Sequence, residues 1–128
     1  MAFIHDDVKD NGLVIMTGAN RRIDITHTEA TTFAQATATF TLGNKAGISV
    51  SLVDGTPSGR AARVAAIADG AVTATSTGAA DDAQFWAITD TANSKLLATG
   101  PLSASQMVTS GNTFSLAEFD AYTITDPA

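Results

Sequence analysis

The sequence predicts a mainly β protein, an antiparallel β-sandwich or barrel of about eight short strands with a short N-terminal helix or arm. Short stretches of alternating polar and apolar residues are separated by turn formers about every 8 to 12 residues along the chain. Only 3 Lys and 2 Glu are present, and these residue types normally cover exposed helix faces. We expect a single domain over residues 1–128, with an N-terminal arm or helix at 1–20 and a β-domain at 21–128.

The composition argues against several classes of protein. Ala, Thr, Gly and Ser make up nearly half of the 128 residues, the formal net charge is −6, and there is no Cys. A disulfide scaffold and a cysteine zinc site are therefore impossible, and an acidic chain is poorly suited to bind nucleic acid through its phosphates. The longest apolar run, residues 64–68, is far shorter than the roughly 20 residues that span a bilayer. Residues 1–4 lack the basic start of a signal peptide, so we expect synthesis in a cytoplasm, no membrane segment and no export by the usual route.

The N-terminal segment has two interpretations. Asp6 or Asp7 can cap the start of a helix. Alternatively, Asn11-Gly12 forms a hairpin turn that leads into a strand at residues 13–16, because a glycine inside a helix costs about 1 kcal/mol. The apolar positions of this segment are Val8, Leu13, Ile15 and Met16.

Residues 21–27 alternate between polar and apolar, which predicts a strand with one buried face. Residues 28–38 then predict a loop with a short helical turn. In that turn Thr32 and Gln35 match a capping box, and Phe33 is expected to fix the turn to the core.

Two further extended stretches follow before the middle of the chain. Residues 40–42 are expected to be extended and residues 43–45 (GNK) to form a turn. Residues 48–53 alternate again and predict a strand. Residues 54–59 are dense in Gly, Pro, Asp and Ser, and predict a loop.

The clearest hairpin is predicted around Asp69-Gly70. Extended arms at residues 60–68 and 71–77 flank this pair, which favours a type I′ turn because both of its residues must take positive φ. On the second arm, one face is expected to carry Thr73, Thr75 and Thr77.

The last third of the chain predicts several more strands. A strand at residues 83–89 precedes a turn at 90–94 and a return strand at 95–99, which Gly100-Pro101 is expected to break. Beyond these we expect short extended pieces at 107–108, 114–116 and 119–124, with a turn at 110–112.

No group of residues matches a known metal site. Imidazole and carboxylate ligands suit zinc or iron, but neither His5 with Asp6 and Asp7 nor His27 with Asp24 and Glu29 has a recognised spacing. Calcium binding would need a regular ladder of acidic residues, which the loops lack. The isolated acidic candidates are Asp54, Asp69, Asp81 and Asp82.

No enzyme signal is present either. The chain lacks the Gly-x-Ser-x-Gly frame of a nucleophilic serine, and residues 57–60 lack the Lys-Ser/Thr ending of a phosphate loop. We therefore predict a protein that is not an enzyme and uses no cofactor or metal. Arg60 and Arg63 are three apart, so they face opposite sides of a strand, and one is expected to pair with an Asp across the sheet.

Trp86 is the one tryptophan and has two interpretations. Exposed, it could stack on a sugar; buried, it would belong to the core. Phe85 and Trp86 are adjacent on a strand and must face opposite sides. We expect one ring in the core and the other in an interface, without deciding which.

Eight short blocks in fixed order span most of the chain: 22–25 (RIDI), 29–33 (EATTF), 36–37 (AT), 42–45 (LGNK), 58–60 (SGR), 85–90 (FWAITD), 96–100 (LLATG) and 115–120 (SLAEFD). These blocks resemble a family of small structural proteins from the gene clusters of tailed phages and prophages. In that family a Pro often follows the Glu that corresponds to Glu29, and a Cys lies in the strand before it, whereas Ala30 and Thr26 occupy those positions here. No known function depends on these two positions.

The resemblance implies a virion structural protein without saying which part of the virion. Our first hypothesis is a capsid decoration (cement) protein that stabilises the shell by binding the major capsid protein and copies of itself. Residues 2–16 are expected to be the main contact element. We expect neither nucleic acid nor a membrane as a partner. Alternatives are a neck, connector or tail component, and a carbohydrate-binding module for the host surface that uses Trp86 or Tyr122. The candidate interface residues are Phe3, Ile4, Val8, Leu13, Arg60 and Trp86.

Overall fold

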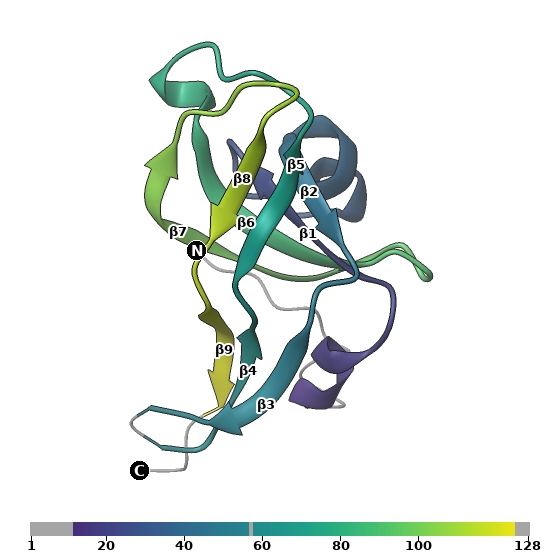
Figure 1. Cartoon of the computed structure of the whole chain (residues 1–128). Coiled ribbons are helices and arrows are strands. Elements are labelled where there is room, and N and C mark those ends of the chain that lie inside the picture. The colour runs from purple at the N-terminus through teal and green to yellow at the C-terminus, as the bar shows by residue number, and fades with distance from the viewer. Residues whose placement is uncertain (1–11, 57, 125–128) are drawn as a thin grey trace.

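The computed structural model describes residues 12–56 and 58–124, and it confirms a mainly β protein with two antiparallel sheets (Figure 1). The larger sheet has the strand order β7-β6-β1-β2-β5-β8 and curls into a half-barrel, and the smaller has the order β3-β4-β9. The strands are β1 (Arg21–Thr26), β2 (Thr41–Ala46), β3 (Val50–Asp54), β4 (Arg60–Val64), β5 (Ile67–Val72), β6 (Ala83–Asp90), β7 (Lys95–Gln106), β8 (Thr113–Leu116) and β9 (Phe119–Ile124). The short helical segments are η1 (Leu13–Thr17), η2 (Gln35–Thr39) and η3 (Ala79–Asp81).

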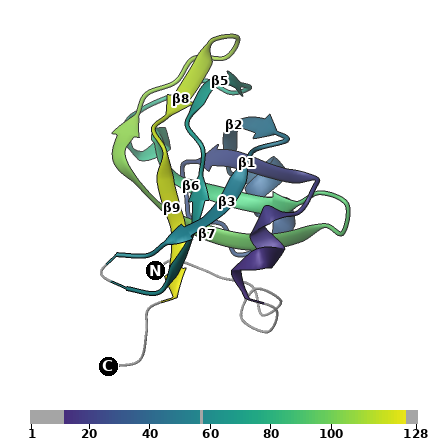
Figure 2. The same ribbon diagram turned by 60° about the horizontal axis from the view of Figure 1, so that its bottom comes forward.

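The small sheet continues three strands of the large one. Along the chain, β2 is followed directly by β3, β4 by β5, and β8 by β9. In each of these pairs one strand belongs to the large sheet and the other to the small sheet. The three strands of the small sheet therefore lie side by side in the same order as the strands β2, β5 and β8 that they extend. The first of these bends contains Gly47, whose φ of 65° is a conformation that glycine adopts at no steric cost. Figures 1 and 2 show the result, a three-stranded extension that projects from one end of the half-barrel.

The main core fills the half-barrel and extends along one face of the small sheet. Alternate residues of the central strands enter it, among them Ile23, Ile25 and Ile88, all fully buried. From the small sheet come Ala62 and Val64. η1 packs against β3 and β4, so the core is shared by both sheets.

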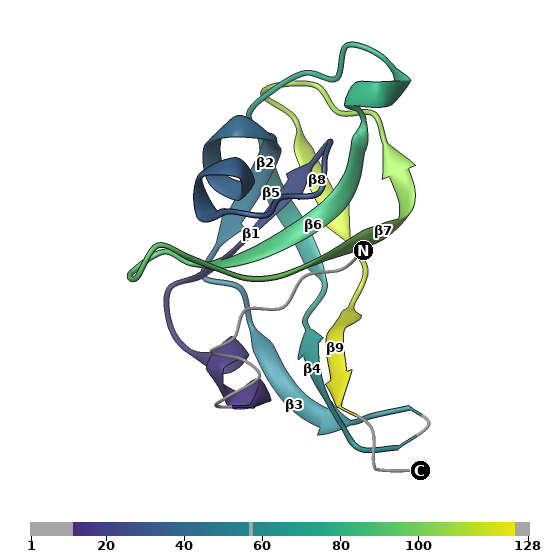
Figure 3. The ribbon, with the colours of Figure 1, turned by 180° about the vertical axis from the view of Figure 1, so that it is seen from behind.

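The opposite face of the large sheet is covered as well. The chain between β1 and β2, which contains η2, packs over β1, β2 and β6 (Figure 3). Small side chains permit this close packing, and Phe40 rather than Phe33 is the aromatic residue on this cluster. β1 is therefore buried on both faces, which corrects the expectation of one buried face. The buried members of the cluster are Ala30, Ala36, Ala87 and Leu96.

Three glycines expected in turns or at a strand break lie inside strands instead. Gly43 is in β2, Gly70 in β5 and Gly100 in β7, so the predicted turn at 43–45, the Asp69-Gly70 hairpin and the break at Gly100-Pro101 are wrong. The physical reason is close packing, since a Cβ on Gly43 would lie 2.6 Å from the Ala71 carbonyl oxygen. A Cβ on Gly70 would overlap the Phe114 ring, and one on Gly100 would lie 2.6 Å from Cζ2 of Trp86.

The N-terminal prediction is also corrected. Residues 13–17 form a single 3-10 helix, so the strand alternative is wrong, and the proposed cap at Asp6 or Asp7 lies outside the described residues. Leu13 is 6% exposed and Met16 is fully buried. Because these two residues belong to the core, removal of residues 2–16 would damage the β-domain, and a deletion that spares it must end before Gly12.

Several predictions are confirmed within small shifts of boundary. Strands occur at β1, β3, β6, β8 and β9, and the loop at 54–59 and the turns at 90–94 and 110–112 are present. Half of the capping box forms, because the Gln35 amide N–H donates to Oγ1 of Thr32 at 3.1 Å. Oε1 of Gln35 accepts from the Thr31 amide at 2.8 Å instead of closing the box on Thr32.

The contact between Gly70 and Phe114 yields a stability prediction. We expect Gly70→Ala to lower the free energy of unfolding by about 1–3 kcal/mol, because the added methyl group must displace a buried ring. Urea denaturation measures the change. Gly78→Ala is the control, since its Cβ would meet nothing within 4 Å and its φ is not positive. Equal stability of the two variants would contradict the packing argument.

Candidate interaction site

The most distinctive surface of the described residues is an apolar face on the small sheet. The pairing register places Leu52, Ala62 and Tyr122 in one row and Asp54, Arg60 and Ile124 in the next, both on the same side. Ala62 in the middle is fully buried. Three large side chains remain partly exposed, at 38% for Leu52, 43% for Tyr122 and 47% for Ile124. We call these three residues the apolar face.

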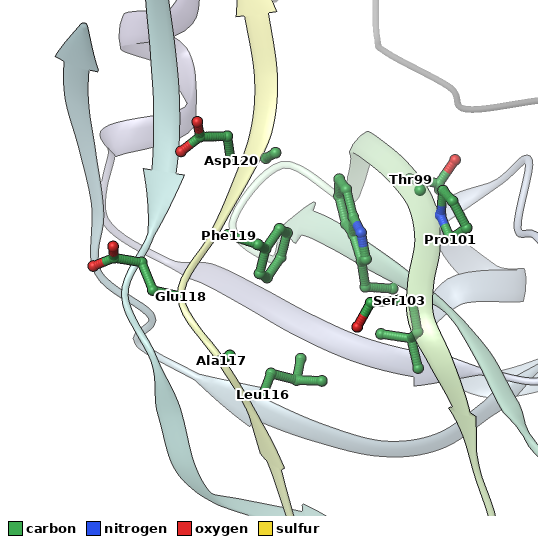
Figure 4. A pocket seen from close by; sticks show the side chains of 12 residues that line it. Thr99, Pro101, Ser103, Leu116, Ala117, Glu118, Phe119 and Asp120 are labelled. Atoms are coloured by element: carbon green, nitrogen blue, oxygen red, sulfur yellow. The ribbon is translucent and has the colours of Figure 1, made fainter. Parts of the chain in front are cut away.

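A hollow of about 470 Å³ lies at the inner end of β9, beside the apolar face. Its walls are residues 99–103 of β7 on one side and residues 116–121 on the other. In Figure 4, Phe119 and Leu116 turn toward the hollow, while Glu118 points away from it. The ring of Phe119 packs against Trp86 with 5.0 Å between centroids. β9 therefore connects an apolar hollow to the partly exposed apolar face.

The polar side chains near this hollow, within the described part of the chain, pair with one another. Glu118 and Asp120 both approach Arg63, with Nε of Arg63 at 2.8 Å from Oδ1 of Asp120. The hydroxyl of Thr99 lies 3.4 Å from Oε2 of Glu29. Carboxylates that pair with a guanidinium or a hydroxyl serve to hold strands together, and the hollow offers an apolar lining and not a set of converging polar groups.

A buried polar cluster links the large sheet to the segment between β1 and β2 that packs over it. Asp24 is fully buried and accepts two hydrogen bonds from Arg22, at 2.8 and 2.7 Å, and one from Thr41 at 2.6 Å. Burial raises the pKa of the Asp24 carboxyl, and the bonds from Arg22 and Thr41 oppose that rise. Nη2 of Arg22 also reaches the Thr37 carbonyl at 3.5 Å, so the cluster links β1, β2 and the segment between them. Its geometry is that of a structural anchor.

Of the candidate metal ligands, His5, Asp6 and Asp7 lie outside the described residues. Within residues 12–56 and 58–124, no three His, Asp or Glu side chains come close enough to hold an ion. Asp24 is occupied by Arg22, and Nε2 of His27 lies 3.8 Å from Asp81. Asp54 pairs with Arg60 and Asp69 pairs with Lys45, so two of the four acidic candidates for calcium are each engaged with a basic side chain. In the same part of the chain, no helix has the length and apolar character that crossing a membrane requires.

The predicted interface residues fall into three groups. Phe3, Ile4 and Val8 lie outside the described residues. Leu13 and Trp86 are buried in the core, each at 6% exposure, so Trp86 is not the exposed platform that sugar stacking requires. Arg60 lies on the surface in the row of Ile124, with its guanidinium 2.8 Å from Asp54. The expected pairing of an arginine with an aspartate across the sheet is present for both Arg60 and Arg63.

Leu52 and Ile124 were not predicted as contact residues, and Tyr122 was named only as a candidate for stacking on a sugar. Tyr122 and Ile124 are two positions apart, which places them on one face of a strand, and this spacing was the available signal. Their exposure depends on the position of β9 beyond the end of the half-barrel, which the alternation alone does not reveal. This chain matches no known family model, no curated protein and no solved structure.

Proposed function

We propose that this protein is a structural component of a tailed-phage virion and acts as a capsid decoration protein. It would be made in the bacterial cytoplasm and bind the outer surface of the shell. The observation that carries the proposal is the apolar face on the projecting small sheet, which supplies a contact surface for another protein. The blocks of sequence that resemble phage structural proteins include β6 and the segment that enters β9.

The proposed mechanism is burial of apolar area, repeated at every copy. Full burial of a large aliphatic side chain gains about 1.5–3 kcal/mol, and the residues of the apolar face, still 38–47% exposed, have part of that gain left to realise. Arg60 in the outer row supplies a charge at the edge of the contact. A net charge of −6 suits a protein on the outside of the shell, because a protein that lined the DNA would gain from positive charge.

Attachment to shells tests the proposal. We expect Ile124→Asp to abolish co-sedimentation of the purified protein with empty capsids of the phage that encodes it, because the carboxylate cannot be buried in an apolar contact. Ser51→Asp is the matched control, since Ser51 is exposed on the opposite face of the same sheet. Attachment of Ile124→Asp at the wild-type level, or no attachment of the wild type, would reject the decoration role.

Copy number separates the decoration role from the neck and tail alternatives. A shell protein is expected at hundreds of copies per virion, a neck ring at about 6 or 12, and a tail tube at an intermediate number. Quantitative mass spectrometry of purified virions gives this number directly. Absence from the virion would reject all three structural roles.

A further inference from the structure

We draw no further inference here: the strongest candidate, the apolar hollow between residues 99–103 of β7 and residues 116–121, carries none because nothing in the structure of residues 12–56 and 58–124 shows what covers it.

Discussion

Arg21→Ala is expected to lower the free energy of unfolding by about 3–5 kcal/mol, a large part of the stability of a domain of this size. The Arg21 side chain is 8% exposed, and its guanidinium lies 3.3 Å from Oδ1 of Asp90, which is 9% exposed. Nε and Nη2 both donate to the Ile15 carbonyl, at 3.0 and 2.6 Å, and Nη1 donates to Ala19 at 2.8 Å. The substitution removes the positive charge beside the buried Asp90 carboxylate and the side-chain donor of the Ile15 and Ala19 carbonyls.

The location of Arg21 explains why one side chain has such a large effect. Arg21 is the first residue of β1, which lies in the middle of the large sheet. Its side chain links η1, through the Ile15 carbonyl, to Asp90 at the end of β6. Urea denaturation followed by circular dichroism measures the loss. Arg60→Ala is the control, because the Arg60 and Asp54 side chains are 55% and 95% exposed and such a pair is worth about 0–1 kcal/mol. Similar losses for the two variants would contradict the anchoring role.

The dependence of stability on pH gives a second readout of the same contact. Burial opposes ionisation of Asp90, but the hydrogen bond from Asn93, the charge of Arg21 and the amide groups of Ala92 and Asn93 outweigh it and lower the pKa. A carboxyl with a lowered pKa stabilises the fold above its ordinary value of 3.8, and that stability is lost as the pH falls below it. In Arg21→Ala, the decrease in unfolding free energy between neutral and acid pH should be smaller than in the wild type, because one cause of the lowered Asp90 pKa is gone. If the unfolding free energy of Arg21→Ala fell with decreasing pH as steeply as that of the wild type, Arg21 would not act on Asp90.

Strands with a clear pattern of strand-forming residues could be predicted from the sequence. The extents of the strands that contain a glycine packed against an aromatic ring could not. β1 was recognisable because polar and apolar residues alternate along it, and β6 was recognisable because it carries Phe85, Trp86 and Ile88. Gly70 and Gly100 looked like turn residues because glycine most often serves a turn. Their actual role depends on Phe114 and Trp86, which reach them from other strands, and no local pattern contains that information.

The same limit applies to the candidate site. Leu13 was predicted as part of the N-terminal contact element and Trp86 was left open between core and interface, and the fold places both in its own core. Tyr122 and Ile124 have an equally apolar pattern and remain partly exposed, because β9 runs past the end of the half-barrel (Figure 2). Which apolar residues stay on the surface is decided by how the sheets bend. The bend at residues 47–49 contains Gly47, but the bends at 65–66 and 117–118 contain neither glycine nor proline and carry no strong sequence signal.

Trp86→Ala is expected to cost about 3–5 kcal/mol of unfolding free energy, because it removes the largest side chain of the core and leaves a cavity. The indole is 6% exposed and lies between two parts of the fold. On one side it packs over Gly100 of β7, and on the other its ring meets Phe119 of β9 at 5.0 Å. The substitution therefore also weakens the contact between the half-barrel and the small sheet. Circular dichroism is the measurement, because the variant has no tryptophan left for fluorescence.

A double-mutant cycle with Gly100 tests the cause of that loss. Gly100→Ala alone should destabilise the protein by about 1–3 kcal/mol, because its Cβ would lie 2.6 Å from Cζ2 of Trp86. In the Trp86→Ala background the same methyl group enters the space that the indole vacated, so it should cost little or even restore some stability. Strictly additive losses would mean that Gly100 is required for the backbone of β7 and not for the ring above it. A coupling of about 1 kcal/mol or more would establish that the indole itself determines which residue β7 accepts at this position.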